Sequence, residues 1–380
     1  MTSKERMLTA MCNREPDMVP VAPDISNMIP CKLTGKPFWD IYLYQNPPLW
    51  QAYIDAVRYF GFDGWLCDIG GDLYFEHAEP DCKIETVIVF RNEERIITRQ
   101  YFEKESGKKE WSDFITVYYR SDPPTYMKAS KIGMDASPEK WEPVEGVKSQ
   151  KKDAELLAEV KEYMGEDGVV GIGCYPPALS NPEGPGYSIY DYYDRYREVK
   201  EWSERAEQEI LKRLKRILEA PVRPDFILTG GSGLLVFNTP KILRDITLPA
   251  LQKITKICRD AGVPTQVHCC GPEKALVEMC ANETDLDSIN PLETPPMGDC
   301  ELKEIKKLFG KRLSLMGNLH TTKIMLKGSV RDVEMACKKA IDDAGEGGGF
   351  ILSTGDQCGR DTPEENIFKM IEVARTYGRY

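Results

Sequence analysis

The sequence has little histidine and lacks any long apolar or basic run. Only three histidines occur among 380 residues, so a histidine inside a motif stands out. No apolar segment is long enough to span a bilayer. The formal charge of −11 argues against a nucleic acid or an anionic membrane surface as a partner. These absences leave an enzyme, or a storage or assembly subunit of an enzyme complex, as the classes to consider.

The N-terminus also lacks the apolar core of a signal peptide. Residues 1–6 carry charged side chains and lead into a helical pattern, so we expect a cytoplasmic protein. Twelve cysteines would suit disulfides in a small secreted chain. In a long chain without a signal peptide we expect them to be mostly reduced thiols, with a few serving as metal ligands.

Short apolar segments alternate with helical patterns along most of the chain. This rhythm predicts a (β/α)8 TIM-type barrel, with an open doubly wound sheet as the alternative. The eight expected strands are Met18–Pro23, Asp63–Asp68, Val169–Cys174, Asp225–Thr229, Pro264–Val267, Leu286–Ile289, Leu313–Met316 and Gly349–Leu352. The last helix should start at Thr362 as cap and Pro363 in its first turn, with Glu365 completing a capping box.

Residues from about 81 to 144 differ in character from the rest. The segments Ile84–Phe90, Ile96–Phe102 and Trp111–Tyr119 are rich in β-branched and aromatic residues and are separated by turn-forming residues. We therefore predict an antiparallel β meander inserted into the barrel. The domain organisation expected is a single barrel domain over residues 1–380 that carries this insertion.

Polar side chains stand at the C-terminal end of nearly every expected barrel strand. A barrel gathers these ends at one mouth, where (β/α)8 enzymes keep their active sites. This ordering favours the barrel over the open sheet. The residues concerned are Asp24, Asp68, His268, Glu293, Asn318, His320, Asp356 and Cys358.

The segment Gln266–Gly271 carries the strongest chemical signal. Alternate side chains of an extended segment share a face, so His268 and Cys270 should point the same way. Imidazole nitrogen and thiolate sulfur are ligands that zinc prefers. Cys358, in a glycine-punctuated loop after the last strand, is the candidate third ligand. A carboxylate, a water or a substrate atom would then take the fourth position, but three unrelated residues stay an open alternative.

Several strand-end residues are further candidates, each with a simpler alternative. Glu293 is a candidate fourth zinc ligand or general acid, or a carboxylate that only accepts a hydrogen bond. His320 either lines the pocket as a catalytic group or hydrogen-bonds the following loop. Asp356 is a candidate catalytic carboxylate. The candidate substrate-binding residues are Asp24, Asp68, Tyr175 and Asn318, although aspartates at strand ends also cap helices.

The C-terminal part resembles a known family in a succession of segments. His268 is followed by Cys269-Cys270-Gly271, and Gly317-Asn318-Leu319-His320 ends the seventh expected strand. Gly348–Ser353 then precedes Asp361–Asn366. This succession is similar to the uroporphyrinogen decarboxylase superfamily, and the similarity is dense from about residue 220 onward. It implies a (β/α)8 fold.

The superfamily has two main kinds of member. Its decarboxylases use no metal and carry an arginine-rich substrate-binding segment, whereas the corresponding stretch here, Val19–Ser26, has no arginine. Its corrinoid-dependent methyltransferases carry H-x-C on strand five and a cysteine after strand eight, which hold zinc. The resemblance to them implies zinc at His268, Cys270 and Cys358. It also implies cobalamin supplied by a partner corrinoid protein, since no D-x-H-x-x-G motif is present.

We therefore expect a zinc-dependent methyltransferase that moves a methyl group between a small methylated substrate and the cobalt of a corrinoid protein. An aromatic loop from Tyr175 to Tyr193, with Trp65, Tyr74 and Phe75, favours a methoxylated aromatic substrate, so that the enzyme would be an O-demethylase. A methylamine or a thiol is also compatible with the motif. The alternatives are a metal-free decarboxylase and a non-catalytic subunit of a methyltransferase complex. A homo-oligomer is compatible with the sequence.

Overall fold

Seven parallel strands form the main sheet of the protein. The computed structural model describes the chain except residues 68, 70–82, 105–106, 149–150, 182–185 and 231–232. In spatial order, the strands are β1 (Gly64–Leu66), β7 (Gly168–Gly173), β8 (Phe226–Leu228), β9 (Thr265–His268), β10 (Ser288–Asn290), β11 (Ser314–Leu319) and β12 (Phe350–Thr354). Every neighbouring pair in this order is parallel.

The segment Val19–Ala22 closes the sheet into a barrel. Val21 forms a parallel bridge with Leu352 of β12, and the amide of Ala22 donates to the Leu352 carbonyl at 2.9 Å. On the other side, the amide of Asp63 donates to the Val21 carbonyl at 2.8 Å, directly before β1. The predicted first strand thus occupies the eighth position between β12 and β1. The (β/α)8 barrel is confirmed.

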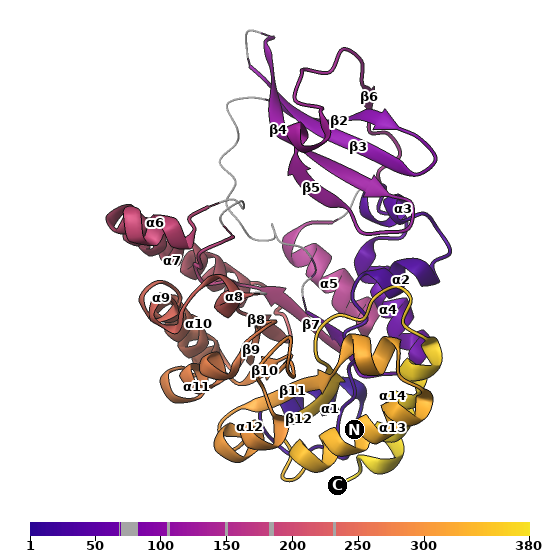
Figure 1. The fold of residues 1–380 in the computed structure, drawn as a ribbon, viewed down its shortest axis with the longest axis vertical. Coiled ribbons are helices and arrows are strands. Elements are labelled where there is room, and N and C mark those ends of the chain that lie inside the picture. The colour runs from indigo at the N-terminus through magenta and orange to yellow at the C-terminus, as the bar shows by residue number, and fades with distance from the viewer. Residues whose placement is uncertain (68, 70–82, 105–106, 149–150, 182–185, 231–232) are drawn as a thin grey trace. The chain divides into compact units, whose positions relative to one another are not determined.

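Helices separate the strands, as the alternating pattern predicts. Figure 1 shows the helices α10 to α14 along the outer side of the strands β9 to β12. Their bounds, with those of the other long helices, are α1 (Ser3–Met11), α4 (Leu49–Phe60), α5 (Asp153–Met164), α7 (Tyr196–Glu219), α10 (Leu248–Ala261), α11 (Lys274–Glu283), α12 (Leu302–Phe309), α13 (Val330–Ala344) and α14 (Glu364–Tyr377).

Shorter helical segments lie in the connections. They are α2 (Met28–Leu33), α3 (Phe38–Tyr42), η1 (Ala129–Ile132), α6 (Ile189–Asp194), α8 (Leu234–Phe237), α9 (Pro240–Ile242), η2 (Leu243–Thr247) and η3 (Thr321–Leu326). None of the helices in the described part of the chain is both long and apolar enough to cross a membrane.

Side chains from the strands fill the centre of the barrel. Trp65, Phe226 and Met316 belong to one buried cluster, to which α1 contributes Met7. The indole Nε1 of Trp65 donates to the buried side-chain Oε1 of Gln266 at 2.7 Å, so the polar atom of this large ring is satisfied. The interior below the mouth is therefore packed, and ligands have access only at the strand ends.

The inserted segment forms a second, antiparallel sheet (Figure 1). Its strands follow the spatial order β5 (Thr125–Lys128), β4 (Lys109–Tyr119), β3 (Arg95–Glu103), β2 (Lys83–Arg91) and β6 (Glu142–Pro143). The three segments predicted as a meander correspond to β2, β3 and β4, and β5 and β6 add the two edges. The antiparallel insertion is confirmed.

The chain divides into two compact units. The barrel unit comprises residues 1–25, 57–74 and 152–380, and the insertion unit comprises residues 26–56 and 75–151. The insertion unit thus begins earlier in the chain than the predicted residue 81, because it includes α2 and α3. The expected organisation as a single domain stays a prediction.

The predicted start of the last helix is wrong in detail. α14 begins at Glu364 with Pro363 as its cap residue, and no side chain caps it by a hydrogen bond. The hydroxyl of Thr362 is instead buried near the thiol of Cys358 and has no hydrogen-bond partner within the described structure. The side chain read as a helix cap therefore belongs to the loop after β12.

Candidate metal centre

His268 and Cys270 lie together at the C-terminal end of β9. His268 is the last residue of the strand, and the extended backbone turns Cys270 to the same side two residues later. The imidazole Nε2 lies 3.2 Å from the Cys270 Sγ. This confirms the predicted pairing of an imidazole and a thiol on one face.

Asp356, in the loop after β12, is the third member of the group. One ligand atom from each of His268, Cys270 and Asp356 lies within 4.8 Å of the others. Oδ1 of Asp356 is 4.0 Å from the Nε2 of His268. Asp356 has φ of 103°, a conformation that a residue with a Cβ rarely adopts. The chain accepts this strained turn at the point where a carboxylate faces the imidazole and thiol.

The donor set fits a zinc ion. One nitrogen, one sulfur and one oxygen are all atoms that zinc accepts, and three protein ligands are typical of a catalytic site that keeps a position for the reactant. All three side chains are at least partly shielded from solvent, and those of His268 and Asp356 are 12% and 31% exposed.

Asn290 determines which imidazole nitrogen is available. It pairs in register with His268 across β9 and β10, and its side-chain nitrogen lies 3.2 Å from the imidazole Nδ1. The Oδ1 of Asn290 is buried without a hydrogen-bond partner. If the side-chain amide of Asn290 is rotated by 180°, its Oδ1 lies beside Nδ1–H of the imidazole and accepts that hydrogen. The oxygen then has a hydrogen-bond partner, and the lone pair on Nε2 is free for a metal. The unpaired oxygen is thus accounted for when Nε2 binds a metal.

Burial keeps the imidazole in the form that metals require. Desolvation lowers the pKa of His268, while the Asp356 carboxylate and the Asn290 hydrogen bond act in the opposite direction. A lowered pKa means that the ring stays neutral at neutral pH, and neutral imidazole is the ligand form.

Cys358, the predicted third ligand, is not one of the grouped residues in the structure, and its role as a ligand stays a prediction. It is fully buried, its amide donates to the Asp24 carbonyl at 2.8 Å, and its thiol interacts with Thr354 and Thr362. Burial raises the pKa of the thiol to about 12. In this loop the carboxylate of Asp356 faces His268, whereas the thiol two residues later is buried.

Glu293 lies against the segment that carries Cys270. Its Oε2 accepts from the amide of Gly271 at 2.5 Å, and only 5% of the residue is exposed. Burial raises the pKa of Glu293, the Gly271 hydrogen bond opposes this change, and the Asp356 charge adds to it. Glu293 therefore holds the position of the H-x-C segment, and its carboxyl group retains a proton to higher pH than an exposed glutamate. Its predicted role as ligand or acid stays a prediction.

His320 and Asn318 line a neighbouring cavity of about 340 Å³. The Nδ1 of His320 accepts from the amides of Thr322 and Lys323 at 3.2 Å each, so this ring caps η3. The side chain of Asn318 donates to the Leu292 carbonyl at 2.9 Å. His320 thus both lines a cavity and hydrogen-bonds the loop that follows it, which are the two alternatives that the sequence offers. Its catalytic role stays a prediction.

The other predicted substrate-binding residues are less informative. Asp24 lies next to the loop after β12, where its amide donates to the Thr354 hydroxyl at 3.0 Å. Tyr175 follows β7 and is exposed. Asp68, Tyr74 and Phe75 lie outside the described residues. Trp65, expected in a substrate wall, is buried in the barrel.

Two residues near the centre escaped the sequence analysis. Asn290 directly follows the predicted strand Leu286–Ile289. Its position as a polar residue at a strand end could therefore have indicated that it belongs to the site. Glu273 is fully buried, and its Oε2 accepts from the amide of Leu292 at 2.8 Å, next to Glu293. A glutamate at a helix start normally indicates an exposed side chain, so the sequence held no signal for its burial.

Comparisons with known proteins agree with this architecture. Residues 196–377 match the family model described as uroporphyrinogen decarboxylase (URO-D). This match covers slightly less than half of the chain, and it falls on the part where the sequence resembles that family. The predicted family is confirmed, and β8 to β12 with the three grouped residues lie within the matched range.

Two proteins of Methanosarcina mazei are similar to the chain. The methylcobamide:CoM methyltransferase MtbA is 32% identical over 133 residues, which are 34% of this chain and 35% of MtbA. The match thus spans about a third of that relative. A solved structure described as a methyltransferase superposes with a TM-score of 0.63 at 16% identity and covers 99% of both chains. At this identity the superposition establishes the shared fold.

Proposed function

We propose that the protein is a methyltransferase that moves a methyl group between a small methylated substrate and the cobalt of a corrinoid protein. The observation that carries this proposal is the group His268, Cys270 and Asp356 at the mouth of a barrel of this family. The local identity to MtbA, whose name describes methyl transfer from a methylcobamide, supports the same chemistry.

In this proposal the three grouped residues hold a zinc ion. When bound there, zinc would act as a Lewis acid on the substrate heteroatom or hold a thiol as thiolate. Asn290 orients the imidazole through Nδ1, and Asp356 supplies an anionic oxygen in place of a second sulfur. Compared with the predicted set, one thiolate is replaced by a carboxylate, which is a harder ligand.

Glu293 supplies the proton that such chemistry needs. An ether oxygen or an amine leaves poorly unless it is activated, and general acids in enzymes often have a raised pKa. Glu293 is buried close to Gly271, with its pKa raised by burial. We assign Oε1 as the proton donor, because Oε2 is engaged by the Gly271 amide. A methoxylated aromatic is the preferred methyl donor, ahead of a methylamine or a thiol.

The corrinoid is proposed to arrive on a partner protein. The chain has no D-x-H-x-x-G corrinoid-binding motif. The strand ends that carry His268 and Asp356 lie at the mouth of the barrel, since the strands are parallel and the interior is packed. A corrinoid protein would therefore dock at this mouth with cobalt facing the substrate.

The test is a spectroscopic assay with the purified protein. The protein is mixed with cob(I)alamin and, in turn, a methoxylated aromatic, methylamines and a methyl thioether, and conversion to methylcob(III)alamin is followed by absorbance. We expect one class to support conversion and His268→Ala to abolish it. No conversion with any class, from a zinc-loaded and folded protein, would contradict the proposal. A zinc-free protein that releases CO2 from a porphyrinogen would instead support a decarboxylase.

A further inference from the structure

The insertion unit contains a cluster of three aromatic rings in mutual contact, which we call the cage. Tyr101 of β3 and Trp111 of β4 are cross-strand partners with ring centroids 5.2 Å apart. Trp141, which precedes β6, lies 5.3 Å from Trp111 and 6.4 Å from Tyr101. The three rings are inclined to one another by 57° to 69°, so they do not stack but meet edge to face.

Cations of the chain itself lie over these rings: Arg99 lies 5.9 Å from the centroid of Trp111, and Lys109 lies over the other two. The ammonium of Lys109 lies 4.4 Å from the centroid of Tyr101 and 4.8 Å from that of Trp141. Among the described residues, Lys109 forms no ion pair with a carboxylate, so the rings are the partners of its charge. The negative faces of aromatic rings attract cations at such distances. Tyr101 and Trp141 therefore provide the distances and electrostatics that an ammonium group requires.

The cage is rigidly held by the surrounding structure. The buried guanidinium of Arg99 donates to the carbonyls of Ser112, Met134 and Ala136 at 2.7 to 2.9 Å, which ties β4 and the segment before Trp141 to β3. β6, directly after Trp141, pairs with β2. The walls are thus positioned before any ligand arrives, which lowers the entropic cost of binding.

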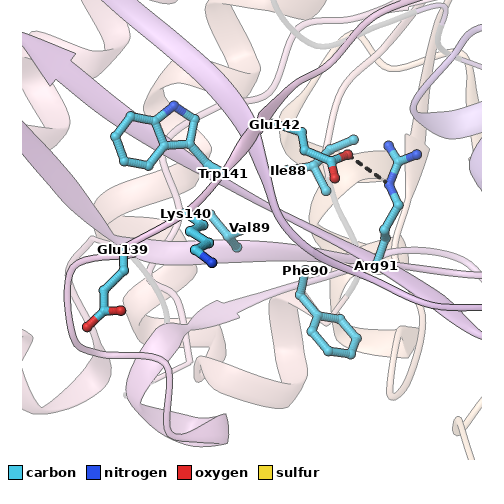
Figure 2. Close-up of a pocket in the computed structure, with 8 residues that line it drawn as sticks. All are labelled: Ile88, Val89, Phe90, Arg91, Glu139, Lys140, Trp141 and Glu142. Atoms are coloured by element: carbon cyan, nitrogen blue, oxygen red, sulfur yellow. Dashed lines mark ion pairs between the residues drawn. The ribbon is translucent and has the colours of Figure 1, made fainter.

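Trp141 also connects the cage to open space. It is 40% exposed and lines a cavity of about 670 Å³ together with Phe90 and the ion-paired residues Arg91 and Glu142 (Figure 2). This volume falls within the usual range for small-molecule sites. A ligand with its head between the rings has room for the rest of the molecule beside Trp141.

We propose that Tyr101, Trp111 and Trp141 form a binding site for the methylated ammonium head of a small molecule, with Lys109 as the internal occupant that the ligand displaces. A quaternary ammonium has no N–H groups to satisfy and is weakly hydrated, so a cage of rings suits it better than a primary ammonium. Lys109 has an alternative partner, because Glu103 stands directly opposite it on β3. Displacement therefore moves the lysine charge from the rings to a neighbouring carboxylate.

The experiment titrates the full chain with tetramethylammonium and follows tryptophan fluorescence and binding heat. We expect saturable binding, and about tenfold tighter binding by Lys109→Ala, since one competing cation–π contact is removed. Lys108→Ala is the matched control, because Lys108 pairs with Glu110 and not with the rings. The neutral isostere tert-butanol should not bind. Neither readout requires a metal or a corrinoid, so the result is independent of the proposed methyl transfer.

Substitutions of the exposed Trp141 provide a second part of the binding experiment. Trp141→Ala should weaken binding of tetramethylammonium at least tenfold, and Trp141→Phe should recover part of it. Tyr126→Ala, which removes an exposed ring of the same sheet that stacks on Phe114, should leave binding unchanged. Equal binding of tert-butanol, no saturable signal for folded Lys109→Ala, or unchanged affinity in Trp141→Ala would each overturn the proposal.

Discussion

The side chains of Asn290 and His268 meet at the ends of two adjacent parallel strands, with the Asn290 nitrogen 3.2 Å from the imidazole Nδ1. Their contact follows from strand register and not from proximity in sequence. It leaves Nε2, on the far side of the ring, facing the Cys270 sulfur. The orientation of the metal-binding nitrogen is thus determined by a residue that is not itself a ligand.

Replacing Asn290 should therefore weaken zinc binding. Loss of a hydrogen-bond partner of a metal-ligating histidine typically lowers affinity roughly 10- to 100-fold. We expect this loss in Asn290→Ala and a smaller one in Asn290→Asp, which keeps an acceptor at Nδ1. Competition with a chromophoric chelator measures the affinity. If Asn290→Ala bound zinc as tightly as the unaltered protein, the imidazole would not depend on this contact.

The loop after β12 offers two potential ligands, and the structure selects between them. Asp356 lies in the group with His268 and Cys270, whereas Cys358 is fully buried and is not one of the grouped residues. We expect Asp356→Ala to lose most bound zinc and Cys358→Ala to retain it. Elemental analysis of dialysed protein gives the metal content. The reverse result, with zinc lost only in Cys358→Ala, would restore the ligand set implied by the family resemblance.

The barrel could be predicted because its signal is local and repeated. Apolar segments such as Val169–Cys174 and Gly349–Leu352 alternate with helical patterns, and each correct assignment supports the next. Met18–Pro23 is predicted as a strand from its apolar residues, although only the hydrogen bonds of Val21 and Ala22 to both sheet edges show that it closes the barrel. The boundaries of the insertion unit depend on long-range packing and were less accurate.

The metal group was predictable only in part, for a physical reason. His268 and Cys270 are two residues apart in an extended segment, so their shared face follows from backbone geometry. Which side chain of the loop after β12 approaches His268 depends on the loop conformation, including the φ of 103° at Asp356, which the residue pattern does not indicate. Asn290 reaches His268 through the register of β9 and β10, which a single sequence does not reveal.

Asp63 stabilises the closure of the barrel. Its fully buried carboxylate accepts from Arg6 at 2.7 Å, from Arg375 at 3.0 Å and from the Val21 amide at 2.9 Å. Removing one partner of a buried ion pair leaves an uncompensated charge and costs about 3–5 kcal/mol. We expect Asp63→Ala to lower the free energy of unfolding by about this amount in urea denaturation.

An exposed ion pair provides the matched control for Asp63. Asp260 pairs with Lys256, and both side chains are 61% exposed. Exposed pairs of this kind contribute about 0–1 kcal/mol, so Asp260→Ala should change the unfolding free energy little. Equal effects of the two substitutions would argue against a special role of Asp63 in closing the barrel.

Glu273 should make the stability of the protein fall as pH rises. The pKa of this buried carboxyl is raised well above its usual value, first by desolvation and then by the charges of Glu293 and Asp299. Below the unfolded-state pKa of about 4.3, both states are protonated and the full stability is present. Between that value and the folded pKa, only the unfolded chain ionises, so stability falls by about 1.4 kcal/mol per pH unit.

Glu273→Gln isolates this contribution, because it keeps an acceptor for the Leu292 amide but cannot ionise. The free energy of unfolding of the variant should increasingly exceed that of the unaltered protein from pH 5 to pH 8. At low pH the two free energies should be most similar. Urea unfolding at several pH values measures the difference. Glu278→Gln, on the exposed face of α11, is the control and should show no such trend. A pH-independent difference for Glu273→Gln would mean that the carboxyl is ionised in the folded protein and that a partner compensates its burial.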